Sequence, residues 1–136
     1  MKPILSLDFD GVIHAYTTPW EAADIIPDPP VEGAMYFIFK ALKKFEVHIY
    51  SGRSHQLNGI YAMRKYIKKH MMMIFPLKDA RDIVYNKIKF PRVKPNAIVH
   101  IDDRAFLFKG EWPDIDELLR FKPWNKKEYE DVHNGY

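Results

Sequence analysis

Four aspartates stand in two short clusters whose spacing suits phosphate chemistry. Asp8 and Asp10 lie two residues apart at the end of an apolar run, and Asp102 and Asp103 end another apolar run much later in the chain. Carboxylates packed together raise one another's pKa values unless a cation lies among them. Because hard oxygen ligands in a chain without cysteine favour Mg²⁺ over zinc, the two clusters predict a magnesium site.

The elements that must position these residues alternate between strands and helices. Short apolar runs predict strands over residues 4–9, 45–50, 72–75 and 97–101. Apolar side chains at helical spacing predict helices over residues 35–42, 60–71, 80–88, with Asp79 as N-cap, and 115–119. This alternation favours an α/β fold, with a single Rossmann-like domain whose mostly parallel sheet carries helices on both faces.

Polar residues follow three of the predicted strands. Asp8, Ser51 and Asp102 each stand where an apolar run ends. In open parallel sheets the binding crevice lies beyond the carboxyl ends of the strands, so these residues are expected to converge there. The competing interpretation is that strand-end aspartates only form turns and cap helices.

The order of these motifs resembles the haloacid dehalogenase superfamily, whose members are mostly phosphatases. The family's first motif is an apolar strand followed by Asp-x-Asp-Gly, which stands here at residues 8–11. Its second is a strand ending in Ser or Thr, here Ser51, and its fourth is a strand ending in paired acids, here Asp102 and Asp103. The resemblance covers the chain from residue 4 to about residue 124.

The resemblance implies a role for each acid. Asp8 would be the nucleophile that forms an aspartyl-phosphate, and Asp10 would protonate the leaving oxygen and then help to activate water. Mg²⁺ would be held by Asp8, the backbone carbonyl of Asp10, and Asp102, while Asp103 would hold a metal-bound water. The implied activity is Mg²⁺-dependent hydrolysis of phosphomonoesters.

The resemblance also implies residues that bind the phosphate oxygens. Ser51 and a lysine of the third motif would take this role. Lys87, Lys89 and Lys94 all precede the last predicted strand, and the Lys-Pro pair at Lys94 is similar to a small bacterial and phage branch of the superfamily. Lys94 is therefore preferred, with Lys89 second. Arg53 is expected either to contact substrate or to pair with an acid near the site.

Length and composition favour one small domain. The chain has 136 residues, and residues 1–136 are expected to form one hydrolase domain without a cap, because Asp8 to Ser51 and Ser51 to Lys94 each span 43 residues. Four prolines within residues 12–32 predict a flap or loop, and residues 124–136 predict a polar tail. The lack of cysteine excludes disulfides. No membrane-spanning run or signal peptide is apparent, so a cytoplasmic protein is expected.

The charge distribution is uneven. Residues 40–94 contain 14 Lys/Arg and 3 Asp/Glu, while the rest of the chain contains 7 and 15. The basic segment is interpreted either as solvated helix faces or as a surface that meets anions. The expected partner is a phosphorylated small molecule or nucleotide, with a nucleic-acid terminal phosphate as a further candidate, and an oligomer partner would be one way to cover the open crevice.

Two alternatives use the same residue types. A receiver domain of response-regulator type also combines Asp, Mg²⁺, Ser/Thr and Lys, but it places its paired acids early, whereas here the pair comes last. A non-catalytic module of the same fold would bind a polyanion or a protein through its basic middle segment. Turnover of a phosphate ester separates this second alternative from the enzyme.

Overall fold

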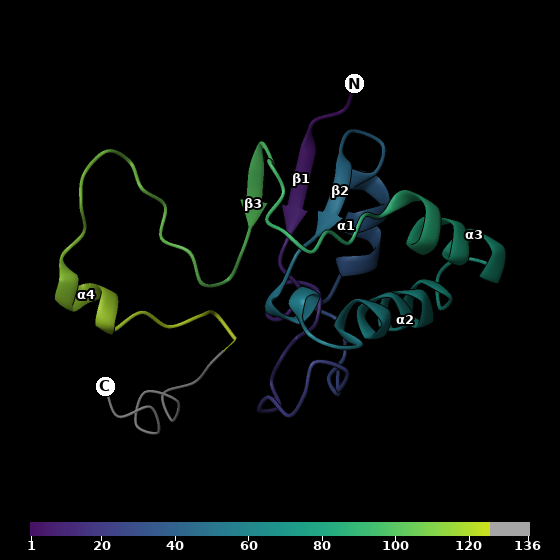
Figure 1. Cartoon of the computed structure of the whole chain (residues 1–136), viewed down its shortest axis with the longest axis horizontal. Coiled ribbons are helices and arrows are strands. Elements are labelled where there is room, and N and C mark those ends of the chain that lie inside the picture. The colour runs from purple at the N-terminus through teal and green to yellow at the C-terminus, as the bar shows by residue number, and fades with distance from the viewer. Residues whose placement is uncertain (126–136) are drawn as a thin grey trace.

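Three parallel strands form the central sheet of this computed structural model, which describes residues 1–125 of the chain. The strands are β1 (Ile4–Leu7), β2 (Glu46–Ile49) and β3 (Val99–Ile101), and β1 lies in the middle of the order β2–β1–β3 (Figure 1). The predicted α/β class with a parallel sheet is confirmed.

The strand register aligns the carboxyl ends of all three strands. Leu7, the last residue of β1, pairs with Ile49 on one side and with Ile101 on the other. The pairing continues one residue further, because the N–H of Tyr50 donates to Leu7 and the N–H of Asp8 donates to Ile101. The residues that follow each strand therefore leave the sheet at the same edge.

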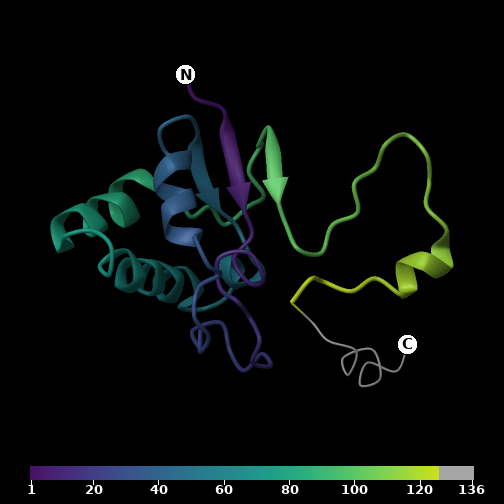
Figure 2. The same cartoon turned by 180° about the vertical axis from the view of Figure 1, so that it is seen from behind.

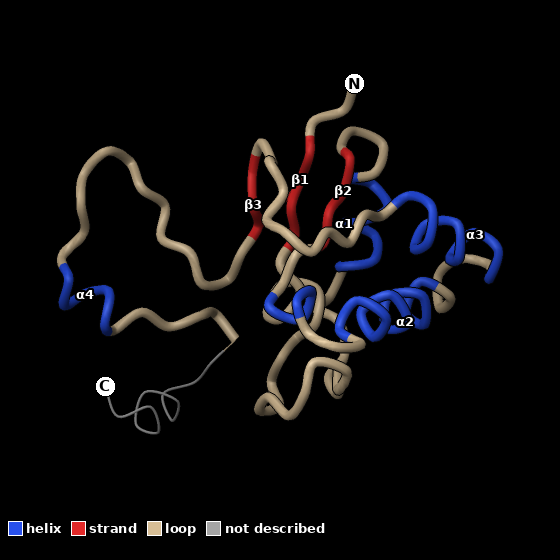
Figure 3. The backbone as a smooth tube through the Cα atoms, in the orientation of Figure 1, coloured by secondary structure: helices blue, strands red, loops and turns tan. Residues whose placement is uncertain are grey.

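Helices connect the strands (Figure 3). The α-helices are α1 (Ala34–Ala41), α2 (Gly59–Met71), α3 (Leu77–Asp82) and α4 (Ile115–Leu119). A short 3-10 helix, η1 (Gly52–His55), follows β2, and α3 continues into a π-helical turn, η2 (Ile83–Lys87). Among residues 1–125, no helix is long and apolar enough to cross a membrane.

The core forms where β1 and β2 pack against α1 and α2. Ile38 of α1, Val47 of β2 and Met63 of α2 are fully buried, as the helical and strand periods of these segments predict. Basic side chains such as Lys65 and Lys69 of α2 point to solvent. The predicted helices over residues 35–42 and 60–71 are thus present with nearly the expected bounds.

The predicted strand over residues 72–75 is wrong. These residues form a turn after α2, in which the N–H of Phe75 bonds the carbonyl of Met71 at 2.8 Å, and Met73 is exposed. Lys89 instead extends the sheet beyond β2, because its N–H donates to Val47 and its carbonyl accepts from Ile49. The apolar run was misleading because Met72, Met73 and Ile74 are exposed in a turn and Phe75 packs against Phe39 of α1, whereas the segment that pairs with β2 carries lysines.

The third predicted helix begins earlier than expected. It starts at Leu77, after Pro76, so Asp79 lies in its first turn and is not the N-cap. Proline suits this position because its ring cannot continue a helix toward the N-terminus. The last predicted strand is shorter than residues 97–101, since β3 begins at Val99.

Residues 12–32 form a loop, as their prolines predict. Within this loop the structure has turns and isolated bridges that join His14 to Asp10 and to Pro30. Tyr66 of α2 anchors the loop from below, because its hydroxyl donates to the carbonyl of Asp28 at 2.8 Å. The loop therefore packs against α2 beside the carboxyl edge of the sheet.

The chain after β3 extends away from the body and then returns (Figure 2). This arm, residues 104–121, includes α4, and it leaves several large apolar side chains exposed, namely Phe106, Leu107, Phe108, Trp112, Ile115, Leu118, Leu119 and Phe121. The predicted polar tail over 124–136 is described only at Trp124 and Asn125, and its residues 126–136 lie outside the described part of the chain.

Burial predicts which residue of α2 carries stability. Replacing Ile67, which is 0% exposed, with alanine is expected to lower the free energy of unfolding by about 2–5 kcal/mol, because it leaves a cavity among β1, β2 and α2. Tyr61 on the same helix is 65% exposed, so Tyr61→Ala is expected to cost less than about 0.5 kcal/mol. Urea unfolding of both variants measures the difference, and equal losses would contradict this core.

Candidate active site

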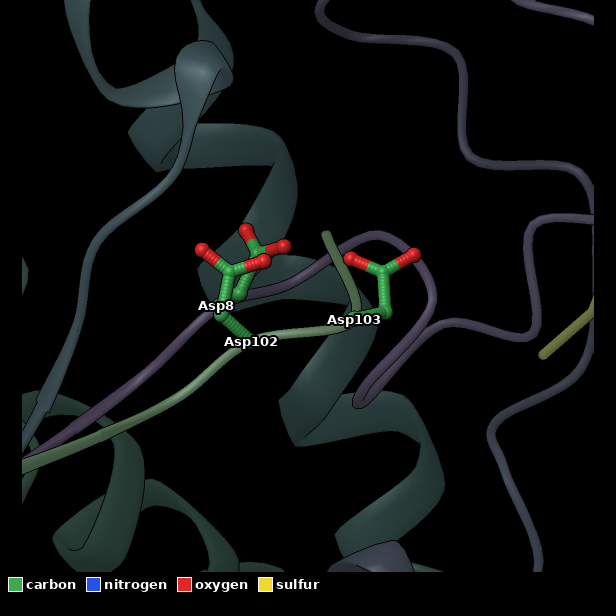
Figure 4. Close-up of side chains that lie close together, drawn as sticks. All are labelled: Asp8, Asp102 and Asp103. Atoms are coloured by element: carbon green, nitrogen blue, oxygen red, sulfur yellow. The ribbon is translucent and has the colours of Figure 1, made fainter. Parts of the chain in front are cut away.

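Three carboxylates converge beyond the carboxyl ends of β1 and β3. Asp8 follows β1, and Asp102 and Asp103 follow β3, so the aligned register brings them to one edge. One oxygen from each of them lies within 4.8 Å of the others. Their side chains point to the same side of the two strands (Figure 4). The predicted meeting of the first and fourth motifs is therefore present in the structure.

The electrostatics of this acid cluster are unfavourable for three free carboxylates. Burial raises the pKa of Asp8 to about 8, and the neighbouring Asp102 and Asp103 add to the rise, against a hydrogen bond from the N–H of Phe9. Burial also raises the pKa of Asp103. Since an ionised Asp8 is disfavoured in the folded chain, raising the pH from about 4 to 8 destabilises the fold unless a cation offsets the charge.

Asp103 supplies the observation that fits a cation best. Both of its carboxylate oxygens are buried, and among the described residues the one group that can hydrogen-bond to them from the acid cluster is Asp8, which does so only when one of the two acids is protonated. Buried carboxylate oxygens without donors are costly, and a divalent cation satisfies both their charge and their lone pairs. Three carboxylates at this separation are a donor set that suits Mg²⁺, which prefers oxygen ligands and keeps waters.

Gly11 brings the loop after β1 against the acid cluster. Its φ of +82° lies in the left-handed region, and a Cβ built on it would lie 2.1 Å from Oδ2 of Asp103. Only glycine meets both conditions, because any side chain would be strained and would displace the Asp103 carboxylate. The glycine of the Asp-x-Asp-Gly motif thus has a physical reason here.

Asp10 lies outside the cluster of three carboxylates and has other partners. Arg53 donates to it from Nε at 2.9 Å and from Nη2 at 3.0 Å, and Nδ1 of His14 lies 2.9 Å from its Oδ1. Burial alone would raise the pKa of Asp10, but the hydrogen bonds from His14 and Arg53 outweigh it and lower the pKa. The structure therefore holds Asp10 as a carboxylate.

Arg53 pairs with an acid, which is one of the two roles expected for it. Its side chain is 1% exposed, and its Nη1 donates to the carbonyls of Ala22, Ala23 and Ile25 in the 12–32 loop. Its guanidinium also lies 4.5 Å from the ring centre of Trp20. Arg53 thus joins Asp10 to the loop, and the contacts give it a positioning role.

His14 is a site residue that the sequence did not assign. It is fully buried, and its Nε2 accepts a hydrogen bond from the N–H of Asp28 at 3.0 Å. A neutral ring that accepts at Nε2 carries its proton on Nδ1, so His14 donates to Asp10. In the sequence, His14 is marked only by standing four residues after Asp10. That spacing does not predict the contact, because the contact depends on how the loop folds.

Ser51 lies at the end of β2, where the second motif was expected. It is buried and acts as the N-cap of η1, accepting at Oγ from the N–H of Arg53 at 3.0 Å. Its own N–H donates to Oγ of Ser54. Among residues 1–125 this hydroxyl is seen only to accept, and because a hydroxyl both accepts and donates, its proton can serve a further acceptor.

The three candidate lysines lie in different surroundings. Lys87 forms an exposed ion pair with Asp82 at 3.5 Å, and Lys89 lines a hollow of about 760 Å³ with Lys2 near the start of β1. That hollow is at the opposite end of the sheet from Asp8. Lys94 is exposed in the segment that leads into β3, and among residues 1–125 it makes no ion pair with the acid cluster.

Comparison with protein-family models, curated proteins and solved structures gives no match. The family resemblance therefore rests on the motifs, and the chemistry of the site rests on its geometry.

The Gly11 contact predicts a specific loss of metal binding. Gly11→Ala is expected to weaken Mg²⁺ binding by about 10- to 100-fold, because the added methyl group displaces the Asp103 carboxylate. Gly33 has the same φ of +82° with nothing within 4 Å, so Gly33→Ala carries the backbone strain of about 1–2 kcal/mol alone. Isothermal titration with Mg²⁺ compares the two, and equal affinities would show that Gly11 does not shape the site.

Proposed function

We propose that this protein is a Mg²⁺-dependent phosphomonoester hydrolase of the haloacid dehalogenase type, with a Rossmann-like domain that has helices on both faces and no cap. The observation that carries the proposal is the acid cluster of Asp8, Asp102 and Asp103 at the carboxyl edge of a parallel sheet, with the Asp103 oxygens buried and, within residues 1–125, facing no basic side chain in an ion pair. A hard cation beside a nucleophilic carboxylate is the arrangement that phosphoryl transfer needs.

Four groups of this chain would hold the cation. They are the carboxylates of Asp8, Asp102 and Asp103, the last directly or through a water, and the backbone carbonyl of Asp10. When bound, Mg²⁺ would offset the negative charges of the nucleophile and of the phosphoryl oxygens. The raised pKa of Asp8 supports this assignment, since a carboxylate in that place needs a positive partner to stay ionised at neutral pH.

The proposed reaction has two displacements at phosphorus. A carboxylate oxygen of Asp8 attacks the phosphorus, the ester P–O bond breaks, and the leaving oxygen takes a proton from Asp10. Water then attacks the phosphorus of the aspartyl-phosphate and gives a proton to Asp10. The acyl P–O bond breaks, and inorganic phosphate and the Asp8 carboxylate are released.

The contacts of Asp10 match the second displacement directly. As a carboxylate held by Arg53 and His14, Asp10 is ready to accept a proton from water. The first displacement needs its protonated form, which a phosphate dianion brought beside it favours by charge repulsion. Arg53 and His14 fix where the carboxyl group points in both steps.

Ser51 and Lys94 would bind the non-bridging phosphate oxygens. The buried hydroxyl of Ser51 lies at the same edge of the sheet as Asp8. Lys94 comes from the exposed segment before β3 and is favoured over Lys89, whose side chain lines a hollow at the other end of the sheet. The cation at Lys94 offsets charge that moves onto the phosphoryl oxygens in the transition state.

A non-catalytic module that binds a polyanion is the second candidate. The excess of 14 Lys/Arg over 3 Asp/Glu in residues 40–94 favours it. Two of the four basic residues on α2 have aromatic partners, however, because Arg64 lies over Phe90 and Lys68 over Tyr85. Lys65 and Lys69 are then the two exposed lysines on α2. The basic surface of α2 is therefore smaller than the number of its basic residues suggests.

The nucleophile assignment predicts a large loss of activity. Asp8→Asn removes the attacking charge and one metal ligand at nearly constant volume, so turnover of p-nitrophenyl phosphate with Mg²⁺ is expected to fall at least about 1,000-fold. Asp116→Asn makes the same chemical change on the exposed face of α4 and should leave turnover unchanged. Chelation of Mg²⁺ should abolish turnover in the unaltered protein, and full activity in folded Asp8→Asn protein would end the proposal.

The lysine assignment predicts which cation the transition state needs. Lys94→Ala is expected to lower kcat/KM by an amount equivalent to about 2–4 kcal/mol, comparable to the loss of an oxyanion donor. Lys87→Ala removes only an exposed ion pair with Asp82 and should change kcat/KM little. If Lys89→Ala loses this activity and Lys94→Ala keeps it, the lysine of the third motif is Lys89.

A further inference from the structure

Two residues at the end of the described chain are tied to the loop that follows Asp8. The indole N–H of Trp124 donates to the carbonyl of Gly11 at 2.7 Å. The side-chain amide of Asn125 donates to the carbonyls of Ala15 and Tyr16 at 2.8 and 3.3 Å. These contacts join segments more than 100 residues apart in sequence. The residues that follow the arm therefore bind to the loop of the first motif.

The hydrogen bond to Gly11 attaches Trp124 to a part of the loop whose backbone has left-handed φ values. Gly11 and Tyr16, which both accept from this segment, have φ values of +82° and +57°, in the left-handed region. Pro123, just before the indole, is buried. The side chain of Trp124 is thus held at its polar end by a short hydrogen bond and at its base by a packed proline.

Trp124 is nevertheless 63% exposed. Because its N–H is already used, what it offers to solvent is the face of an aromatic ring. Gly11 links this side chain to the acid cluster, since its carbonyl accepts from Trp124 and a Cβ built on it would clash with the Asp103 carboxylate. A rigid aromatic ring with an exposed face loses little conformational entropy when it stacks with a second planar ring.

We propose that Trp124 forms a stacking subsite next to the acid cluster, and that the substrate is a phosphate ester that carries a nucleobase. The phosphate lies at Asp8 and Asp103, and the base lies on the exposed face of the indole held by Gly11. The inference rests on the proposed phosphatase function and adds the substrate class to it. Every base has a π-face, so this subsite recognises nucleotides without selecting one base.

The test compares two esters that differ only in the base. Adenosine 5′-monophosphate and ribose 5-phosphate share the phosphorylated ribose, so the ratio of their kcat/KM values isolates the contribution of the base. Base stacking on an aromatic side chain corresponds to about 5- to 150-fold. The unaltered protein is expected to favour the nucleotide by about tenfold, and Trp124→Leu is expected to bring that ratio close to one.

Two further variants separate stacking from support of the loop. Trp124→Phe loses the hydrogen bond to Gly11 but keeps an aromatic face, so its ratio should stay within about threefold of that of the unaltered protein even where both rates fall. Trp112 is 87% exposed on the arm, and Trp112→Leu should leave both rates unchanged. If Trp124→Leu lowers both rates equally and preserves the ratio, Trp124 only supports the loop and the stacking subsite is overturned.

A binding measurement keeps this inference distinct from the proposed function. If the unaltered protein hydrolyses neither these esters nor p-nitrophenyl phosphate, the phosphatase proposal fails, and calorimetric titration in Mg²⁺ then decides on the subsite alone. Tighter binding of adenosine 5′-monophosphate than of ribose 5-phosphate, by about tenfold and lost in Trp124→Leu, supports stacking. Equal binding of the two compounds, or binding of neither, overturns it.

Discussion

The repulsion among three carboxylates at one edge of the sheet is the constraint on which the rest of the site depends. Parallel pairing of Leu7 with Ile101 fixes where β1 and β3 end, so Asp8 cannot avoid the acids that follow β3. Burial of β1 and β2, together with backbone pairing between β1 and the exposed β3, maintains this register despite the electrostatic cost. The fold therefore concentrates negative charge in one place, and it is in such a place that a divalent cation binds most strongly.

The loop after β1 is fixed by three sets of contacts, one on Asp10 and two on Gly11 of the first motif. Arg53 and His14 hold the side chain of Asp10, Asp103 limits what can stand at Gly11, and Trp124 bonds the backbone of that glycine. Apart from His14, which belongs to the loop itself, these groups come from distant parts of the chain. The entropic cost of closing a loop rises only slowly with its length, so contacts between distant parts of the chain can form in a small domain.

The sequence predicted the elements whose side chains follow a period, and it failed where tertiary contacts decide. The ends of β1 and β3 and the core faces of α1 and α2 were visible in apolar spacing, and so the acid cluster was visible too. The segment that pairs beyond β2 was missed because Lys89 interrupts its apolar pattern, while the apolar residues 72–75 serve a turn. Nothing local marks Arg53 as the partner of Asp10, since that pairing depends on how the 12–32 loop folds over η1.

The end of the chain gives the clearest case of a role that composition hides. A polar segment after Pro123 suggests a solvated tail, yet Trp124 and Asn125 donate hydrogen bonds to the carbonyls of Gly11, Ala15 and Tyr16 in the first-motif loop. These donors from the far end of the described chain satisfy backbone carbonyls of that loop, and hydrogen bonds of this kind stabilise a loop conformation. Because these donors follow the exposed arm in sequence, the loop around Gly11 is held in part by residues that come after that arm. The site and the far end of the described chain thus form one structural unit.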